Sequence, residues 1–165
     1  ITVPKVDNQA ARTIVYDNIL SMLAVFFESG GADPAWFINK NCIPQLAKMS
    51  LTIGLGGVPV WMPANGAAGQ RYSTLFGYPV IPVEHAQTLG TQGDIMLADW
   101  KQYLIIEKGS VKRDVSIHVR FLQDETAFRF IKRIDGQPIW DQPVTPYKGA
   151  AGEKHSPFVQ LAVRA

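Results

Sequence analysis

The spacing of apolar residues changes several times along the chain, and each spacing predicts a different element. From Thr13 to Phe27, apolar residues recur every three or four positions, which is the pattern of one buried helix face. Thr13 can cap the first turn, and Gly30-Gly31 tolerates the left-handed conformation in which helices often end. We therefore expect an amphipathic helix over residues 13–27.

The next segment predicts a strand, a short helix and a long loop. Ala35–Ile38 is an apolar run between Pro34 and Asn39, which favours a buried strand. A helix is expected from residue 41 or 42 to residue 49, with Pro44 in its first turn. Ser50–Thr74 is rich in glycine and proline around residues 58–62, and we expect a long irregular excursion with one short strand.

The rest of the chain is dominated by strand patterns. Prolines interrupt the strand expected at Tyr78–Val83, which favours a sheet edge. Two further strands, residues 94–98 and 103–107, are expected to be joined tightly through Asp99-Trp100-Lys101. Val115–Phe121 alternates apolar and polar residues, so a half-buried strand is expected, paired with residues 127–134 as a hairpin. Asp135-Gly136 is a turn signal, and residues 158–163 form the last expected strand.

Composition narrows the class of protein. The 165 residues are 47% hydrophobic and 18% charged, which is enough apolar material for one domain, with or without a small appendage. The formal net charge of +2 does not require a nucleic-acid partner. A single cysteine, Cys42, excludes an internal disulfide, and no apolar run has the length of a membrane span.

The candidate chemistry is sparse. Cys42 shares no local motif with any of the scattered histidines, and no His/Cys spacing is typical of a metal site. The glycine-rich segments at residues 54–57 and 66–69 lack the strand–loop–helix context of phosphate-binding loops. The sequence therefore predicts no catalytic, cofactor-binding or metal-binding residue. Asp94 and Asp99 leave an acid–base pair open as an alternative, although aspartates at strand ends more often cap turns.

Basic residues gather on the expected hairpin and alternate with aromatic ones. They are Lys108, Lys112, Arg113, Arg120, Arg129, Lys132 and Arg133, among Phe121, Phe128 and Phe130. Two interpretations are open: weak contact with nucleic acid, or solvated strand faces and inter-subunit ion pairs. We favour the second, because Asp114, Asp124, Glu125 and Asp135 balance the charge locally.

One segment, Gly77–Tyr103, resembles a pattern of tailed-phage major capsid proteins of the Hong Kong 97-type fold. The matching positions are Gly77, Tyr78, Pro79, Val80, Gly93, Asp94, Ile95, Asp99 and Tyr103. The resemblance continues over most of the chain, through residues 35–39, 43–48, 128–129, 133–136 and 156–161. Each piece is a loose pattern, but their order and spacing together are fairly specific.

The resemblance implies an α+β fold, with a mixed β-sheet flanked by helices and a protruding antiparallel β-hairpin. Residues 1–110 would form an axial-domain-like core, and residues 111–165 a peripheral-domain hairpin and a C-terminal return strand. The family's N-terminal arm, extended loop and spine helix have no counterpart here, so we expect that this chain cannot build a closed shell alone. The start at Ile1 suggests a processed or trimmed chain.

The implied function is structural: a major capsid protein of a tailed phage or prophage, not an enzyme. It would self-assemble into hexamers and pentamers of a virion shell in the bacterial host cytoplasm, without a membrane. Its partners would be its own copies, scaffold and portal proteins, and encapsidated DNA through weak non-specific contact. An encapsulin-type compartment shell protein and a small hydrolase using Asp94, Asp99 or Cys42 are the alternatives.

Five residues are the candidate inter-subunit contacts: Trp61, Met62, Arg120, Arg129 and Arg133. Large aromatic and apolar side chains at the centre of an interface supply much of its binding energy. Packing of Trp61 and Met62 in the domain's own core is an equally good interpretation.

Overall fold

The computed structural model describes residues 1–29, 33–53, 56–59 and 74–164. It divides the chain into two compact units. The sheet unit comprises Ile1–Lys101 and Trp140–Ala165, and the hairpin unit comprises Gln102–Ile139. Each unit is described by itself.

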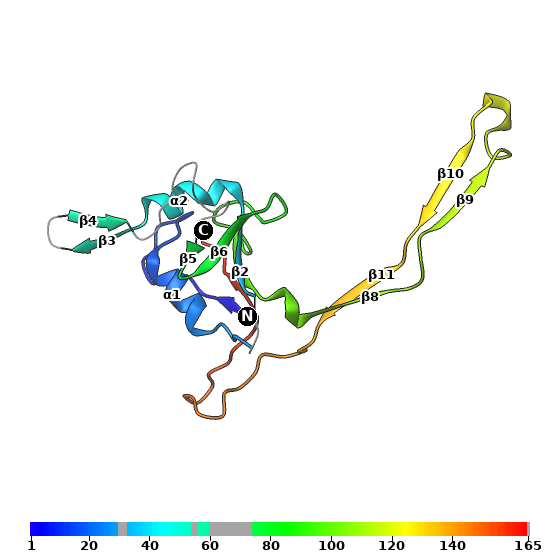
Figure 1. Cartoon of the computed structure of the whole chain (residues 1–165). Coiled ribbons are helices and arrows are strands. Elements are labelled where there is room, and N and C mark those ends of the chain that lie inside the picture. Colours follow the sequence, from blue (N-terminus) through cyan, green and yellow to red (C-terminus); the bar gives the residue numbers. More distant parts are fainter. Residues whose placement is uncertain (30–32, 54–55, 60–73, 165) are drawn as a thin grey trace. The chain divides into compact units, whose positions relative to one another are not determined.

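A six-stranded mixed sheet organises the sheet unit (Figure 1). Its strands, in spatial order, are β1 (Thr2–Val3), β12 (Phe158–Leu161), β7 (Ile95–Ala98), β2 (Ala35–Ile38), β6 (Tyr78–Pro82) and β5 (Thr74–Leu75). The pairs β1–β12 and β2–β6 are parallel, and the other pairs are antiparallel. The expected α+β class with a mixed sheet is confirmed.

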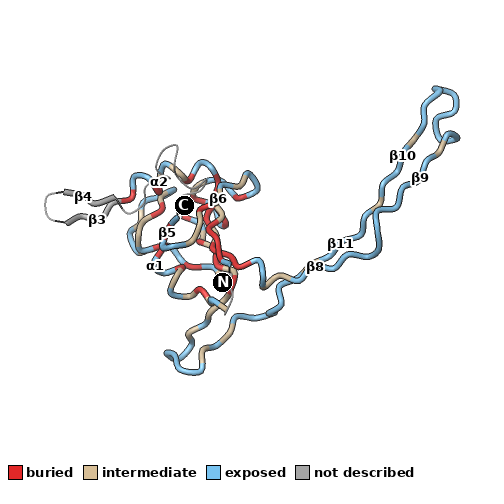
Figure 2. The backbone as a smooth tube through the Cα atoms, viewed as in Figure 1, coloured by how far each residue is buried: buried red, intermediate tan, exposed pale blue. Residues whose placement is uncertain are grey.

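One face of this sheet carries the core. Alternate residues on the three central strands are fully or almost fully buried: Trp36, Ile38, Ile95, Leu97, Val159 and Leu161. They form one cluster with Ile19 and Met22 of α1 (Tyr16–Ala24) and with Leu46 of α2 (Ile43–Lys48). Figure 2 shows the buried residues concentrated in this unit.

The first helix is shorter than the apolar pattern predicts. It begins at Tyr16 because the Asn18 side-chain oxygen accepts from the Val15 amide (3.0 Å). Thr13, the predicted cap, instead donates its hydroxyl to the Ala10 carbonyl. The chain leaves the helix after Ala24 because Phe26 forms a β-bridge with Ser156, which replaces helical hydrogen bonds by a tertiary pairing. The predicted glycine stop at residues 30 and 31 lies outside the described residues.

The second helix is confirmed, with one addition. A short 3-10 turn, η1 (Lys40–Cys42), precedes α2 and is capped by the Asn39 side chain, which accepts from the Asn41 amide (3.0 Å). Pro44 lies in the first turn of α2, where its missing amide hydrogen breaks no helical hydrogen bond.

The segment that follows contains two strands where one was expected. β3 (Ser50–Ile53) and β4 (Gly56–Pro59) pair as an antiparallel ladder. The remainder of the predicted loop, residues 60–73, lies outside the described residues.

The proline-interrupted strand is not at the sheet edge. β6 lies between β2 and β5, although β5 pairs only with Tyr78 and Pro79. Because the Val83 amide donates to the Ile38 carbonyl (2.8 Å), the nitrogen of Pro82 faces away from β2. Pro82 therefore removes no hydrogen bond from the β2–β6 ladder, and the strand tolerates it in an inner position.

A buried ion pair joins β7 to the end of the chain. Arg164 and Asp94 are both fully buried, and the Arg164 guanidinium donates to Asp94 Oδ2. The Arg164 Nε atom also donates to the Thr13 carbonyl (2.6 Å), and the Gly90 amide donates to Asp94 Oδ2 (2.9 Å). The pair therefore links segments that lie 70 residues apart in the sequence.

The hairpin unit is one long antiparallel hairpin with an interruption. β8 (Tyr103–Glu107) pairs with β11 (Ile134–Pro138), and β9 (Lys112–Ser116) pairs with β10 (Ala127–Ile131). Short 3-10 turns, η2 (Trp100–Gln102) and η3 (Phe121–Gln123), lie before β8 and at the closed end. Between the two ladders, residues 108–111 lie opposite residues 132–133 and form a bulge, where Gly109 has a left-handed φ of 69°.

Two details of the expected hairpin are wrong. The alternating strand stops at Ser116, and Ile117, Val119 and Phe121, expected on a buried face, are 57%, 74% and 73% exposed. Among the described residues of this unit, no second layer packs over the ladder, so the alternation has no core to face. Asp135-Gly136 lies inside β11 and is not a turn. β8 follows β7 as the second of the two expected strands, and it pairs with β11.

The boundary between the two units does not lie at residue 110, where the domain boundary was expected. Both β8 and β9 belong to the hairpin unit, and residues 140–165 group with residues 1–101 because β12 pairs with β7. That the units correspond to axial and peripheral domains stays a prediction.

The buried ion pair predicts a large cost for removing one partner. Arg164→Met should lower the free energy of unfolding by about 3–5 kcal/mol, because it leaves the Asp94 carboxylate buried without its cation. Urea denaturation followed by tryptophan fluorescence measures this. Arg12→Met removes an exposed guanidinium from the same unit and should change stability by less than about 0.5 kcal/mol. Equal stability of the two variants would show that the pair is not structural.

Candidate functional site

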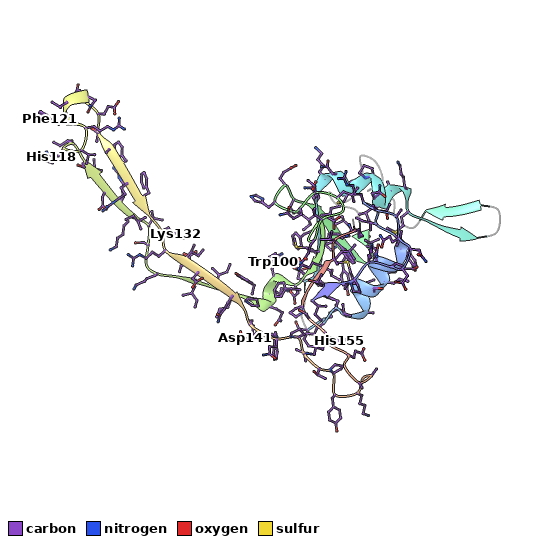
Figure 3. All side chains as sticks on the ribbon, turned by 180° about the vertical axis from the view of Figure 1, so that it is seen from behind. Trp100, His118, Phe121, Lys132, Asp141 and His155 are labelled. Carbon is purple, nitrogen blue, oxygen red and sulfur yellow. The ribbon has the colours of Figure 1, made fainter. Side chains whose placement is uncertain are left out.

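Exposed apolar side chains distinguish the hairpin unit from the sheet unit. Phe128 and Phe130 of β10 are 58% and 65% exposed, and Leu122 of η3 is 92% exposed. Figure 2 shows almost the whole unit as exposed, and Figure 3 shows side chains on both sides of its ribbon, with His118 and Phe121 near its closed end. A two-stranded hairpin is marginally stable by itself in water, so this surface favours contact with another surface.

The strand register sorts the outer ladder into two faces. Val115 lies opposite Phe128, and Arg113 lies opposite Phe130, so these side chains share an apolar face that carries one arginine. Asp114 opposite Arg129 and Lys112 opposite Ile131 share the other face, which is mainly polar. The outer ladder is therefore amphipathic although neither of its faces is buried.

The inner ladder depends on a glycine. A Cβ atom at Gly136 would lie 2.6 Å from Cε1 of Tyr103 and 3.1 Å from the Leu104 carbonyl oxygen. The Tyr103 ring thus occupies the space that a side chain at residue 136 would fill. It covers the backbone of Gly136, which would otherwise be exposed to solvent. This explains why a residue pair with strong turn chemistry lies inside a strand.

A basic concavity lies at the bulge between the two ladders. Its volume is about 440 Å³, and its lining includes Lys108, Lys112, Arg129 and Arg133 together with Asp114. Arg129 is paired with Asp114, with Nη2 to Oδ2 at 2.6 Å. Four basic side chains against one acidic side chain give this hollow an excess of positive charge.

The predicted contact residues fall in different places. Arg129 and Arg133 line the basic concavity together, whereas Arg120 lies near the closed end and pairs with Glu125 (3.0 Å). Trp61 and Met62 lie outside the described residues. The role of all five in subunit contact stays a prediction.

The sheet unit has an apolar surface that the sequence patterns did not reveal. Phe37, Met96 and Phe158 lie on the sheet face opposite the core and are only partly buried. The half-exposed Trp100 ring packs edge-on against Phe37 and Phe158, with ring centroids 5.7 Å apart in each case. An apolar concavity of about 240 Å³ adjoins them. The one available signal was a tryptophan in a connection that was otherwise polar.

Asp94 and Asp99 do not form an acid–base pair. They flank opposite ends of β7, and both are fully buried. Asp94 is engaged by Arg164, whereas Asp99 Oδ1 accepts from the Lys101 amide (3.1 Å) and caps the turn into η2. The turn-capping interpretation is therefore confirmed for Asp99.

Cys42 is buried and unsuited to nucleophilic chemistry. Burial, reinforced by the nearby Asp94 carboxylate, raises the pKa of its thiol from 9.0 to about 12. Its sulfur lies 3.6 Å from the Asp94 carbonyl, which accepts a weak hydrogen bond. At neutral pH the thiol stays protonated, whereas nucleophilic cysteines are thiolates.

Two classes of site are absent from the described residues. Those residues contain no group of three or more His, Cys, Asp or Glu side chains that could hold a metal ion. No helix among them is both long enough and apolar enough to cross a membrane.

The family model described as "Phage capsid family" matches residues 2–149. The chain belongs to the phage capsid family. The match includes the whole hairpin unit and most of the sheet unit. No curated protein matches the chain.

A solved structure shares the fold of this chain. It is the "capsid of empty GTA particle computed with C5 symmetry", with a TM-score of 0.60 and 17% sequence identity. The alignment covers 91% of this chain and 45% of that chain, so the chain spans less than half the length of the capsid protein it matches. At this identity the likeness shows a shared fold.

The capsid-pattern residues take structural roles. Gly77 has a φ of 84° in the tight turn between β5 and β6, and Gly93 has the same φ just before β7. Tyr78 donates its hydroxyl to Glu28 (3.0 Å), and Asp94 and Asp99 hold the two ends of β7. The pattern thus records turns and buried hydrogen bonds of the family fold.

The buried thiol predicts slow labelling. At pH 8 a soluble maleimide or disulfide reagent should modify Cys42 at least about a hundredfold more slowly in the folded chain than in denaturant. Stability should also fall as pH rises from about 9 toward 12, because the unfolded thiol loses its proton first. Labelling followed by mass spectrometry measures the first effect. Equal rates with and without denaturant would place Cys42 in an accessible site.

Proposed function

We propose that this chain is part of a structural shell protein of a phage-like capsid and works by self-association. Family membership and the shared capsid fold support this, and the hairpin unit is the observation that carries it. The exposed Phe, Leu and Ile side chains of this hairpin can add apolar surface to a neighbouring copy.

The apolar residues of the hairpin can contribute to the free energy of association. Burying a large apolar side chain contributes about 1.5–3 kcal/mol, so contacts made by a few of them supply a substantial part of an association free energy. Phe128 and Phe130 are the central candidates, since they lie on one face with Val115. Arg120 and Arg129 would add ion pairs at the margin, where charged residues set register more than affinity.

The remaining expectations belong to the same proposal. Copies would associate as hexamers and pentamers of a virion shell that encloses DNA, assembled in the cytoplasm of a bacterial host. Scaffold and portal proteins would be its further partners. Trp61 and Met62 would lie near the capsomer axis, and the sheet and hairpin units would correspond to the axial and peripheral parts of the subunit. No catalytic step is part of this function.

The proposal predicts that polar substitutions on the hairpin weaken association without unfolding the sheet unit. Phe128→Asp with Phe130→Asp should lower the association constant at least about thirtyfold, because hot-spot aromatic residues each contribute about 2 kcal/mol or more. Sedimentation velocity over a concentration series measures this, and urea denaturation monitors the sheet unit.

The matched control is Tyr147→Asp. Tyr147 is 98% exposed in the sheet unit, so its replacement adds a charge without removing a hairpin contact. It should associate like the unmodified chain. If the hairpin variant and the control associate equally, the hairpin is not the contact surface; if the unmodified chain stays monomeric at every concentration, self-association itself is refuted.

A further inference from the structure

The basic concavity at the bulge contains cations that the protein itself does not neutralise. Arg129 is bound twice to Asp114 Oδ2, from Nε at 3.1 Å and from Nη2 at 2.6 Å. Lys132 is paired with Glu107 at 2.9 Å. Within the described chain, Lys108, Lys112 and Arg133 form no ion pair, and all three are exposed.

The backbone leaves this concavity open. The last ladder hydrogen bond before the bulge runs from the Lys108 amide to the Arg133 carbonyl (3.0 Å). Gly109 then turns the chain with its left-handed φ of 69°, and a Cβ atom there would meet nothing within 4 Å. A glycine and a serine, Gly109 and Ser110, therefore line the hollow beside the cations.

Excess positive charge in an open hollow of about 440 Å³ suits an oxyanion. Two sources are possible: the carboxylates of another copy of this chain, or the phosphates of nucleic acid. Another copy would need several free carboxylates close together, and in this hairpin Glu107, Asp114 and Glu125 are already paired with Lys132, Arg129 and Arg120. Nucleic acid presents a phosphate at every nucleotide, so it matches several cations at once.

We propose that Lys108, Lys112 and Arg133 bind the phosphate backbone of nucleic acid at this bulge. The inference rests on the proposed shell function, since a shell protein meets the nucleic acid that its particle encloses. It goes further by assigning the contact to one side of one bulge.

The same geometry predicts binding without sequence preference. Register places Phe128 and Phe130 on the face opposite Arg129, so these rings do not stack on bases at the basic concavity. Lysines and an arginine that reach phosphates fix position and carry no sequence information. Affinity should therefore depend steeply on salt and little on base composition.

The test compares two triple variants that lose the same three charges. The site variant carries Lys108→Gln, Lys112→Gln and Arg133→Gln; the control carries Lys40→Gln, Lys148→Gln and Lys154→Gln, which are exposed positions of the sheet unit. Fluorescence anisotropy of a labelled mixed-sequence DNA duplex is measured over a salt series, at protein concentrations below those that give self-association.

The site variant should bind at least about tenfold more weakly than the unmodified chain, and its slope of log affinity against log salt should be shallower by about 2 to 3. The control variant should keep most of the DNA affinity and most of the salt slope. Circular dichroism checks that the variants retain their strands.

Three results would overturn the proposal. The first is the absence of DNA binding by the unmodified chain at low salt, and the second is equal loss of affinity in both triple variants. The third is unchanged DNA affinity in the site variant together with weaker self-association, which would assign the hollow to acidic groups of another copy. A chain that binds DNA through these residues yet never self-associates would refute the shell function alone.

Discussion

The Asp94–Arg164 pair is the constraint on which the sheet unit depends. It is buried among β7, the segment before α1 and the end of the chain, so it forms only when these distant segments are all in place. Ion pairs in such surroundings contribute less net stability than their Coulomb energy suggests, because both charges are desolvated. Their effect is specificity: any other register of β7 against β12 would leave a charge buried without its partner. Among the described residues, the hydrogen bonds from Gly90 and Arg164 both go to Oδ2 of Asp94, and Oδ1 accepts none.

The hairpin unit follows a different physical logic. It has regular cross-strand pairing over two ladders, three exposed ion pairs and almost no burial. Exposed ion pairs contribute little, since water and salt screen them. The order of this unit in isolation therefore comes from backbone pairing and from local devices such as the Tyr103 ring over Gly136. Surfaces of this kind gain most of their stabilisation from what they contact.

The sequence predicted the parts that form a core and misplaced those that do not. The apolar runs at Ala35–Ile38 and Phe158–Leu161 were assigned correctly, because burial on a central strand leaves a direct signature in composition. The helix bounds were too wide because its start is set by Asn18, which accepts from the Val15 amide, and not by Thr13. Its end is set by tertiary hydrogen bonds to Ser156. Alternation from Val115 to Phe121 predicted a buried face where none exists, since alternation reports two faces and does not say what covers either. Arg129 and Arg133 were predicted as contact residues from the sequence. The concavity that they share arises from a bulge, and no local sequence pattern predicted that bulge.

The bulge at residues 108–111 also affects how the hairpin tolerates insertions and deletions. Ladder register is fixed on both sides of it by separate sets of cross-strand pairs, while the bulge itself absorbs a mismatch in strand length. An insertion or deletion of a residue there alters a loop already in irregular conformation, whereas the same change inside β9 or β10 would move every outer side chain to the opposite face. Insertions and deletions in this hairpin should therefore be concentrated at the bulge. There they can change the direction of the β9–β10 ladder while its apolar residues stay on one face.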